Sequence, residues 1–238
     1  LFTLYELRAG SDWWLGSYMA RFRRPEFHRM ASVFGMFELA VHKPFYTKLN
    51  ELLHLDNDEF YLSYHTNATL QSRMKLIDSD INDPDDLIAL AAFSFIEGVV
   101  LYSSFAFLKH FQSAGKNKLV NVVRGINFSV RDENLHAEAS AWTFRQLAKE
   151  SKRTIDPNVY TSLALSVYEH ECAIIHEIFS KGKIDGITET QMKHFVESRI
   201  NLCLQNLGMK PIFEVEYNPI AKWFYEGING FQFNDQFS

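Results

Sequence analysis

The chain has few of the residues that interrupt helices or cross-link a fold. Its 238 residues include 11 glycines, 6 prolines and 2 cysteines. This scarcity of glycine and proline argues against a turn-rich β fold and favours long, uninterrupted helices. Cys172 and Cys203 are far apart and lack the close spacing of zinc ligands. We therefore expect both to be reduced core residues of a cytoplasmic protein.

A strong charge of one sign is also missing. The net charge is −5 and the sequence pI is near 6.0, so nothing indicates binding to nucleic acid or to a membrane surface. We find no apolar run of transmembrane length and no signal peptide. The chain is instead rich in hydrophobic residues, which make up 47% of it and include 21 phenylalanines. A chain of this length and composition can bury a substantial core.

Hydrophobic residues recur with helical spacing along the chain and predict one all-α domain over 1–238. The predicted helices cover 1–19, 25–53, a stretch from the 56–59 cap to 76, 82–111, 118–149, 157–179, 188–207 and 219–227, followed by an irregular aromatic tail. The chain begins inside a helical pattern and ends without a stop signal. We therefore expect segments to be missing from both ends.

Two local signals refine this pattern. The cluster Asn82–Asp86 is typical of a helix N-terminal cap, and the helix that follows is apolar nearly all round, which indicates burial on most sides. Pro44 lies inside the second helical pattern. Because proline removes a helical hydrogen bond and clashes with the preceding turn, we expect a kink or rearrangement just before it.

Glutamates and histidines recur inside these apolar helices in two similar halves. The set is Glu6, Glu38 and His42, then Glu97, Glu133 and His136. Residues three or four apart share a helix face, so each glutamate–histidine pair can bind one ion. A four-helix bundle that binds two metals takes one glutamate from each of two helices and a glutamate with a histidine from each of the others. Carboxylate and imidazole ligands favour iron or manganese over structural zinc.

Each member of this set also has an ordinary interpretation. Glu133 and His136 could be a chance pair on a solvated helix face, because a glutamate and a histidine occur often at this spacing. Glu97 could pair with a lysine or an arginine, although an unpaired carboxylate among apolar neighbours is costly. The agreement of the whole set is much harder to attribute to chance.

Short motifs spread over nearly the whole chain carry a family resemblance. They are Phe2-Thr3-x-x-Glu6, Glu38-x-x-x-His42-x-x-x-Tyr46, Phe95-Ile96-Glu97-Gly98 with Tyr102-Ser103-Ser104-Phe105, Arg131-Asp132-Glu133-Asn134-Leu135-His136, and Asn218-Pro219-Ile220. Through these motifs the chain resembles the small, radical-generating subunit of class I ribonucleotide reductase. The resemblance implies a ferritin-like helical bundle with a dimetal-carboxylate site in a central four-helix core.

The resemblance also implies residue roles. The six glutamates and histidines match the metal ligands, with Glu6 at a position that is usually aspartate. Tyr46 matches the tyrosine that holds the stable radical, although spacing alone favours an ordinary core tyrosine. Asp132 matches the carboxylate that orients a ligand histidine and takes part in radical transfer. Its ordinary interpretation is a surface aspartate beside Arg131.

The implied activity is that of an enzyme subunit that supplies deoxyribonucleotides for DNA replication. Two metal ions, iron in the first place and manganese or a mixed pair as alternatives, activate oxygen and generate the tyrosyl radical. The radical passes to a large catalytic subunit, which reduces ribonucleotides to deoxyribonucleotides. The implied assembly is a homodimer that binds this large subunit, while the charge balance predicts neither nucleic acid nor a membrane as a partner.

Three points stay open. The first pair is E-x-x-x-H where the family has E-x-x-H, so a strict match would use Leu39, unless a π-bulge near Pro44 absorbs the extra residue. Trp13 and Trp14 follow the first ligand and are expected in the core. The relay tryptophan and the C-terminal tyrosine of the family therefore lie outside this chain. The rival functions are another ferritin-like dimetal oxidase and a metal-free, non-catalytic helical scaffold.

Overall fold

The computed structural model describes residues 2–215 and 217–234, and these residues form helices and connecting loops without a strand. The predicted all-α class is therefore confirmed. By its internal contacts the chain divides into two compact units, Leu1–Ala89 and Leu90–Ser238. The single domain over 1–238 stays a prediction.

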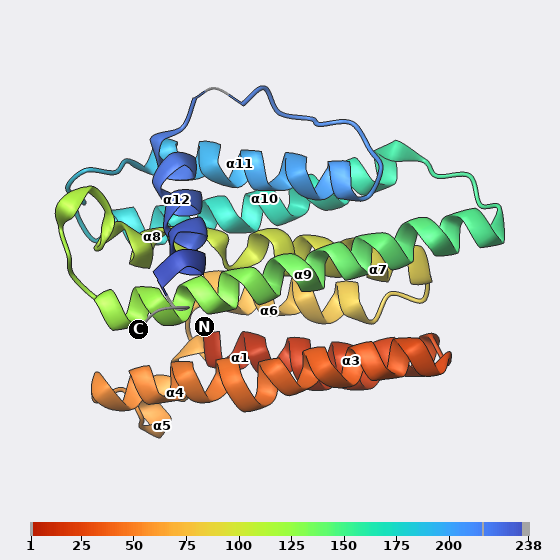
Figure 1. The fold of residues 1–238 in the computed structure, drawn as a ribbon, viewed down its shortest axis with the longest axis horizontal. Helices are drawn as coiled ribbons and strands as arrows, with labels where there is room; N and C mark the ends of the chain where they lie inside the picture. Colours follow the sequence, from red (N-terminus) through yellow and green to blue (C-terminus); the bar gives the residue numbers. More distant parts are fainter. Residues whose placement is uncertain (1, 216, 235–238) are drawn as a thin grey trace. The chain divides into compact units, whose positions relative to one another are not determined.

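The first unit starts with two long helical runs, each of which contains a π-helical segment. The first run is α1 (Phe2–Leu7), η1 (Arg8–Tyr18) and α2 (Met19–Arg21), and the second is α3 (Pro25–Phe37), η2 (Glu38–His42) and α4 (Lys43–Leu52). Pro25 suits the first helical position, where its fixed φ is favourable and an N–H is not needed. The runs are antiparallel, because α1 packs on α4 while η1 packs on α3 (Figure 1).

Aromatic side chains fill the space between these two runs. Trp13, Trp14 and Tyr18 are fully buried, and the ring of Trp14 meets that of Phe34 edge-on with centroids 4.9 Å apart. This confirms the expectation that both tryptophans belong to the core.

The rest of the first unit is more broken than predicted. The helix expected to end at 76 is instead α5 (Asp58–Leu62), the 3-10 turn η3 (Ser63–His65) and α6 (Ala68–Ile81). The prediction of one helix here was wrong because Asn67 starts a new one, its side chain accepting a hydrogen bond from the Leu70 backbone N–H at 2.8 Å.

A central apolar helix opens the second unit. It consists of α7 (Asp86–Phe95), η4 (Ile96–Val100) and α8 (Tyr102–His110), with α7 starting just before the unit boundary. The Asp85 carboxylate accepts from the Leu87 backbone N–H at 2.9 Å, which confirms the cap cluster. The expectation that no apolar run reaches transmembrane length was wrong, since this helix alone among the described residues is long and apolar enough to cross a membrane. Its most apolar window is 94% buried, as in a core helix.

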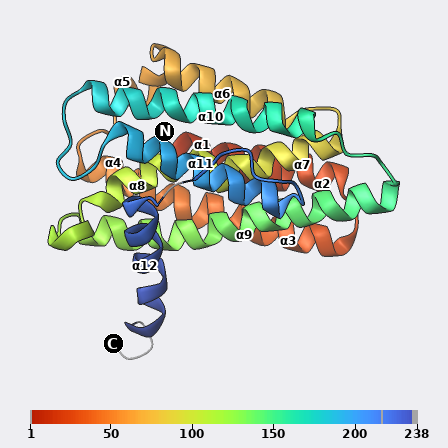
Figure 2. The same ribbon diagram turned by 90° about the horizontal axis from the view of Figure 1, so that it is seen from above.

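The remaining helices of the second unit pack around this central one. They are α9 (Val120–Ser151), α10 (Pro157–Ser180), α11 (Glu189–Asn206) and α12 (Pro219–Asn234), with the 3-10 turn η5 (Ser113–Gly115) before α9. In Figure 2, α12 crosses α9 and extends beyond it, and α12 also contacts α8 and α11.

The prediction of an irregular tail after 227 was wrong as far as Asn234, where α12 ends, and residues 235–238 lie outside the described residues. Tertiary contacts hold this helix at Phe224 and Ile228. The buried Lys109 ammonium donates to the Phe224 carbonyl at 2.8 Å and lies over the Phe224 ring. The Arg131 guanidinium donates to the Ile228 carbonyl at 3.2 Å.

Candidate metal centre

The first unit brings together three of the predicted ligands, which we call the first triad: Glu6 on α1 and Glu38 and His42 on η2. The His42 Nδ1 lies 3.0 Å from the Glu38 carboxylate and 3.7 Å from that of Glu6. All three side chains are buried. One ligand atom from each lies within 4.8 Å of the others, which is close enough to share an ion.

The π-helical segment explains how the irregular spacing still works. Glu38 and His42 are the first and last residues of η2, which ends two residues before Pro44. A π-helical turn takes up one more residue than an α-helical turn, so the extra residue does not rotate His42 away from Glu38. The π-bulge expected at this place is confirmed.

A glycine allows the two helical runs to approach each other at this site. Gly10 lies one helical turn after Glu6, and a Cβ placed on it would lie 2.9 Å from the Glu38 Cβ and 2.7 Å from the Leu39 side chain. Non-bonded contacts of a Cβ atom are essentially never shorter than 3.0 Å, so a side chain at position 10 would force the two runs apart. Leu39 occupies the position that the family's E-x-x-H spacing would give to the glutamate. Its side chain therefore packs against the backbone of the first run.

The second unit holds a matching set, the second triad: Glu97 on η4 and Glu133 and His136 on α9. The His136 Nδ1 lies 3.3 Å from the Glu133 carboxylate and 3.8 Å from that of Glu97. All three are buried, and their ligand atoms again lie within 4.8 Å of one another. Each unit thus repeats the same chemistry, with one imidazole nitrogen facing two carboxylates.

The donor set of each triad fits a hard or borderline divalent metal ion. Each triad buries two carboxylates beside one imidazole. Removing an ionised carboxylate from water costs several kcal/mol, a large share of the roughly 5–15 kcal/mol that stabilises a domain. Oxygen and imidazole nitrogen donors without thiolate suit iron or manganese.

The structure places the two remaining predicted residues next to the triads. Tyr46 is on α4, one turn after His42, and only 1% of it is exposed. Its ring stacks on Phe2 at 4.5 Å and meets Phe45 edge-on at 5.0 Å, so it lies in an aromatic environment. Asp132 is on α9, immediately before Glu133, and is half-buried. The roles of both stay predictions.

Sequence reasoning missed two features. The π-helical segments η1 and η4 had no proline to mark them, although η4 contains Glu97 and η1 starts two residues after Glu6. It also missed Arg199, a buried arginine on α11 that contacts residues beside Glu97 and Glu133. Its sequence signal was weak, because a single arginine in an amphipathic helix is ordinary.

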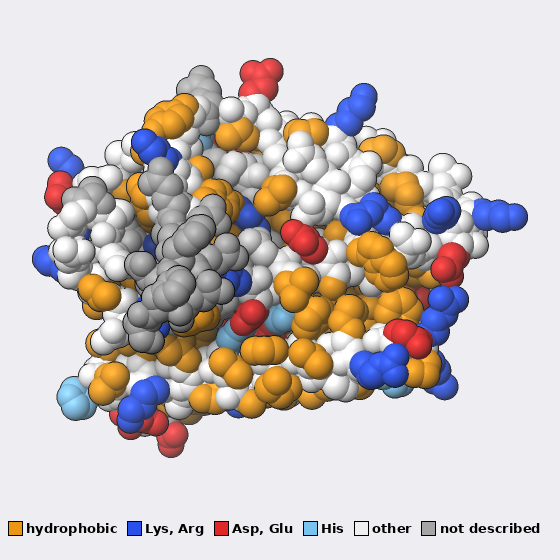
Figure 3. Space-filling view, in the orientation of Figure 1, with side chains coloured by type: hydrophobic (Ala, Val, Ile, Leu, Met, Phe, Trp, Pro, Cys, Tyr) orange, Lys and Arg blue, Asp and Glu red, His pale blue; other side chains and the backbone are white. Residues whose placement is uncertain are grey.

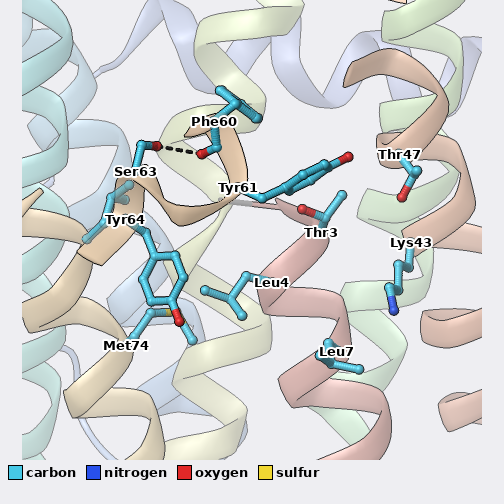
Figure 4. Close-up of a pocket in the computed structure, with 11 residues that line it drawn as sticks. Thr3, Leu4, Leu7, Lys43, Thr47, Phe60, Tyr61, Ser63, Tyr64 and Met74 are labelled. Atoms are coloured by element: carbon cyan, nitrogen blue, oxygen red, sulfur yellow. Dashed lines mark hydrogen bonds between the residues drawn. The ribbon is translucent and has the colours of Figure 1, made fainter. Parts of the chain in front are cut away.

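A groove of about 430 Å³ opens in the first unit (Figure 4). It is lined by Thr3, Leu4, Leu7, Lys43, Thr47, Phe60, Tyr61, Ser63, Tyr64, Leu70 and Met74. Several of these flank the first triad in sequence, such as Leu7 and Lys43, yet no triad residue lines the groove, and neither does Tyr46. The residues that line the groove are therefore separate from the first triad.

The family model described as ribonucleotide reductase, small chain, matches residues 4–219, most of the chain. The chain belongs to this family. A probable ribonucleoside-diphosphate reductase small subunit of Invertebrate iridescent virus 3 is 28% identical over 235 residues, which are 89% of this chain and 61% of the viral protein. This small chain thus spans about three-fifths of that relative's length.

Solved structures show the same fold as this small chain. The dimanganese(II) form of NrdF from Streptococcus sanguinis superposes with a TM-score of 0.79 at 23% identity, over 95% of this chain and 78% of NrdF. The Rnr4 homodimer of Saccharomyces cerevisiae gives a TM-score of 0.70 at 16% identity, over 97% of this chain and 74% of Rnr4. These likenesses confirm the predicted ferritin-like fold.

Proposed function

We propose that this chain is the radical-generating small subunit of a ribonucleoside-diphosphate reductase, and that its two triads bind two metal ions. The observation that carries the proposal is the repeated triad. Each unit offers two buried carboxylates and one imidazole, which are half of the ligands of a dimetal-carboxylate site in a four-helix core. Membership of the small-chain family supports the same conclusion.

When bound, such a metal pair supplies the oxidising chemistry that activates oxygen. The six triad residues would hold it, through carboxylate oxygens and the Nδ1 atoms of His42 and His136. Iron is our first choice of metal, with manganese or a mixed pair as alternatives.

The protein residues around the metals have separate tasks. Tyr46 would give up one electron and its phenolic proton and keep the resulting radical away from water, because its ring is buried against Phe2 and Phe45. Asp132 would orient a ligand histidine and take part in passing the radical on. A large subunit would then use the radical to reduce ribonucleotides. We place this reaction in the cytoplasm.

Metal uptake is the direct test of the proposal. We expect the purified chain, incubated with Fe(II) under oxygen, to bind two iron ions and to give a tyrosyl EPR signal. Glu97→Gln should lose iron because an amide is a poor ligand for a hard cation. Metal analysis and EPR spectra measure both results.

A matched control separates ligation from general burial. Glu171 is also a fully buried glutamate of the second unit, but its carboxylate accepts a hydrogen bond from the Ser103 hydroxyl at 2.5 Å and it lies outside the triads. Glu171→Gln should keep two iron ions. A wild-type chain that binds no metal would favour the non-catalytic scaffold. Two bound ions without a radical, under both iron and manganese loading, would favour a different dimetal oxidase.

An exposed apolar surface supports the proposed homodimer. Leu15, Val33, Met36 and Val41 are each 40–48% exposed, and the last three lie on α3 and η2. Figure 3 shows hydrophobic side chains gathered over α3 and its continuation. Apolar patches of this kind commonly mark interfaces between proteins.

A charge in this surface should break the dimer. We expect Met36→Glu to shift the chain from dimer to monomer in sedimentation equilibrium, because a carboxylate cannot be buried there without a partner. Val120→Glu is the matched control, since Val120 on α9 is as exposed as Met36. A dimer that survives Met36→Glu unchanged would place the interface elsewhere.

A further inference from the structure

Arg199 is the residue outside the triads with the most unusual surroundings. It lies on α11, and only 2% of it is exposed. The guanidinium stays protonated in proteins, so a full positive charge is buried here. Among the described residues it makes no salt bridge, and its contacts are a carbonyl, an amide oxygen, a hydroxyl and an aromatic ring.

These contacts fix the two segments that carry the glutamates of the second triad. The Arg199 Nε donates to the Gly98 carbonyl at 2.9 Å, inside η4 and one residue after Glu97. Its Nη2 donates to the Asn134 Oδ1 at 2.9 Å, one residue after Glu133 on α9. One rigid guanidinium therefore bridges both ligand segments.

Two aromatic residues hold the guanidinium in place. Its central carbon lies 3.8 Å from the ring centroid of Tyr102, and its Nη1 donates to the Tyr225 hydroxyl at 2.9 Å. Tyr102 also donates from its hydroxyl to the same Asn134 oxygen at 2.8 Å. Burial raises the pKa of Tyr102, so this hydroxyl stays protonated and available as a donor. Both lone pairs of the Asn134 oxygen are thus in use, which fixes the orientation of its amide.

The backbone of η4 is accessible to Arg199 because Gly98 has no side chain. A Cβ on Gly98 would lie 2.3 Å from the Cys203 Sγ, so α11 packs directly on the backbone at this point. Cys203 is one helical turn after Arg199 and lies on the same face of α11. Arg199 thus donates to a carbonyl within the π-helical segment η4.

Packing alone does not account for an arginine at this position. Burying a cation without an anionic partner costs several kcal/mol, and well-packed apolar side chains commonly replace buried charged groups without loss of stability. An arginine in this position can, however, donate to two segments at once, which an apolar side chain cannot do. We propose that Arg199 is a positioning residue that sets the second triad for metal binding by tying together the segments of Glu97 and Glu133. This inference rests on the proposed dimetal function.

Metal affinity measured on the folded, metal-free chain tests the inference. Arg199→Lys keeps the charge, but one ammonium cannot reproduce the planar fork that reaches both segments. We expect one of two Mn(II) sites to weaken about 10–100-fold, the usual cost of losing a residue that orients a metal ligand. The visible absorption of the Co(II)-loaded protein should change as well, because it reports ligand geometry.

Two further variants make the result specific. Tyr102→Phe removes only the second donor to Asn134 and should weaken the same site by less. Tyr168→Phe is the matched control, because it removes another hydroxyl bond to α11, to the Glu197 carboxylate at 2.6 Å. It should leave Mn(II) affinity and the Co(II) spectrum at wild-type values.

The outcomes separate this inference from the proposed function. A wild-type chain that binds no Mn(II) contradicts the dimetal function itself. A wild-type chain with two sites and an Arg199→Lys variant with the same affinities and Co(II) spectrum overturns only the role of Arg199. Lower thermal stability without any change in affinity would make it a structural residue. Should Arg199→Lys not fold, unchanged affinity in Tyr102→Phe overturns the inference.

Discussion

Replacing Tyr46 by phenylalanine is expected to remove the tyrosyl EPR signal completely while the chain still binds two metal ions. The substitution deletes the phenolic O–H, without which the ring cannot give up an electron and a proton together. It keeps the ring that stacks on Phe2, so the helix carrying His42 should stay in place. The loss of one hydroxyl costs on the order of 1 kcal/mol, which a folded domain tolerates.

The control for this prediction is another buried tyrosine of the same unit. Tyr18 is fully buried against Trp13, Trp14 and Phe22, but it lies outside the first triad. Tyr18→Phe should keep the full signal after iron loading under oxygen. A tyrosyl signal that persists in Tyr46→Phe would show that the radical forms on a different residue.

Much of this site could be predicted because its signals are local. A glutamate and a histidine three or four residues apart share a helix face in any helical fold, so Glu133 and His136 were paired from spacing alone. Pro44 likewise marked the irregular helix before it, and the π-helical segment η2 is found there. The closeness of the Glu6 carboxylate to the His42 Nδ1, at 3.7 Å, was predicted only from the bundle pattern, since helix packing decides it.

What could not be predicted depends on contacts between distant residues. The second half of α12 carried no clear helical signal, and the helix is held by Lys109 and Arg131 from other elements. The bridge from Arg199 to Gly98 joins residues about a hundred positions apart. No spacing rule within a helix can reveal such a pair. The break before α6 was local, but its Asn67 cap was overlooked.

Glu38 is the predicted ligand that departs from the family spacing. Its replacement should lower the metal affinity strongly. We expect Glu38→Gln to weaken one metal site by at least about 100-fold, since loss of an orienting residue alone costs up to that much. The amide keeps the size of the side chain but not the charge that a hard cation requires. The measurement is Mn(II) binding by competition with a chelator. Glu51→Gln, which removes a carboxylate paired with Lys48 at the far end of α4, is the control and should bind as wild type.

A second substitution tests which residue, at position 38 or 39, binds the same metal ion as His42. If the family's three-residue spacing held here, Leu39→Glu in the Glu38→Gln chain would restore binding. We expect no rescue, because Leu39 packs against the Gly10 backbone, where an added carboxylate would face the other helix instead of the imidazole. The Glu38 carboxylate, by contrast, lies 3.0 Å from the His42 Nδ1, because both residues belong to the π-helical segment η2. Wild-type affinity in Glu38→Gln, or full rescue by Leu39→Glu, would show that η2 does not set the ligand register.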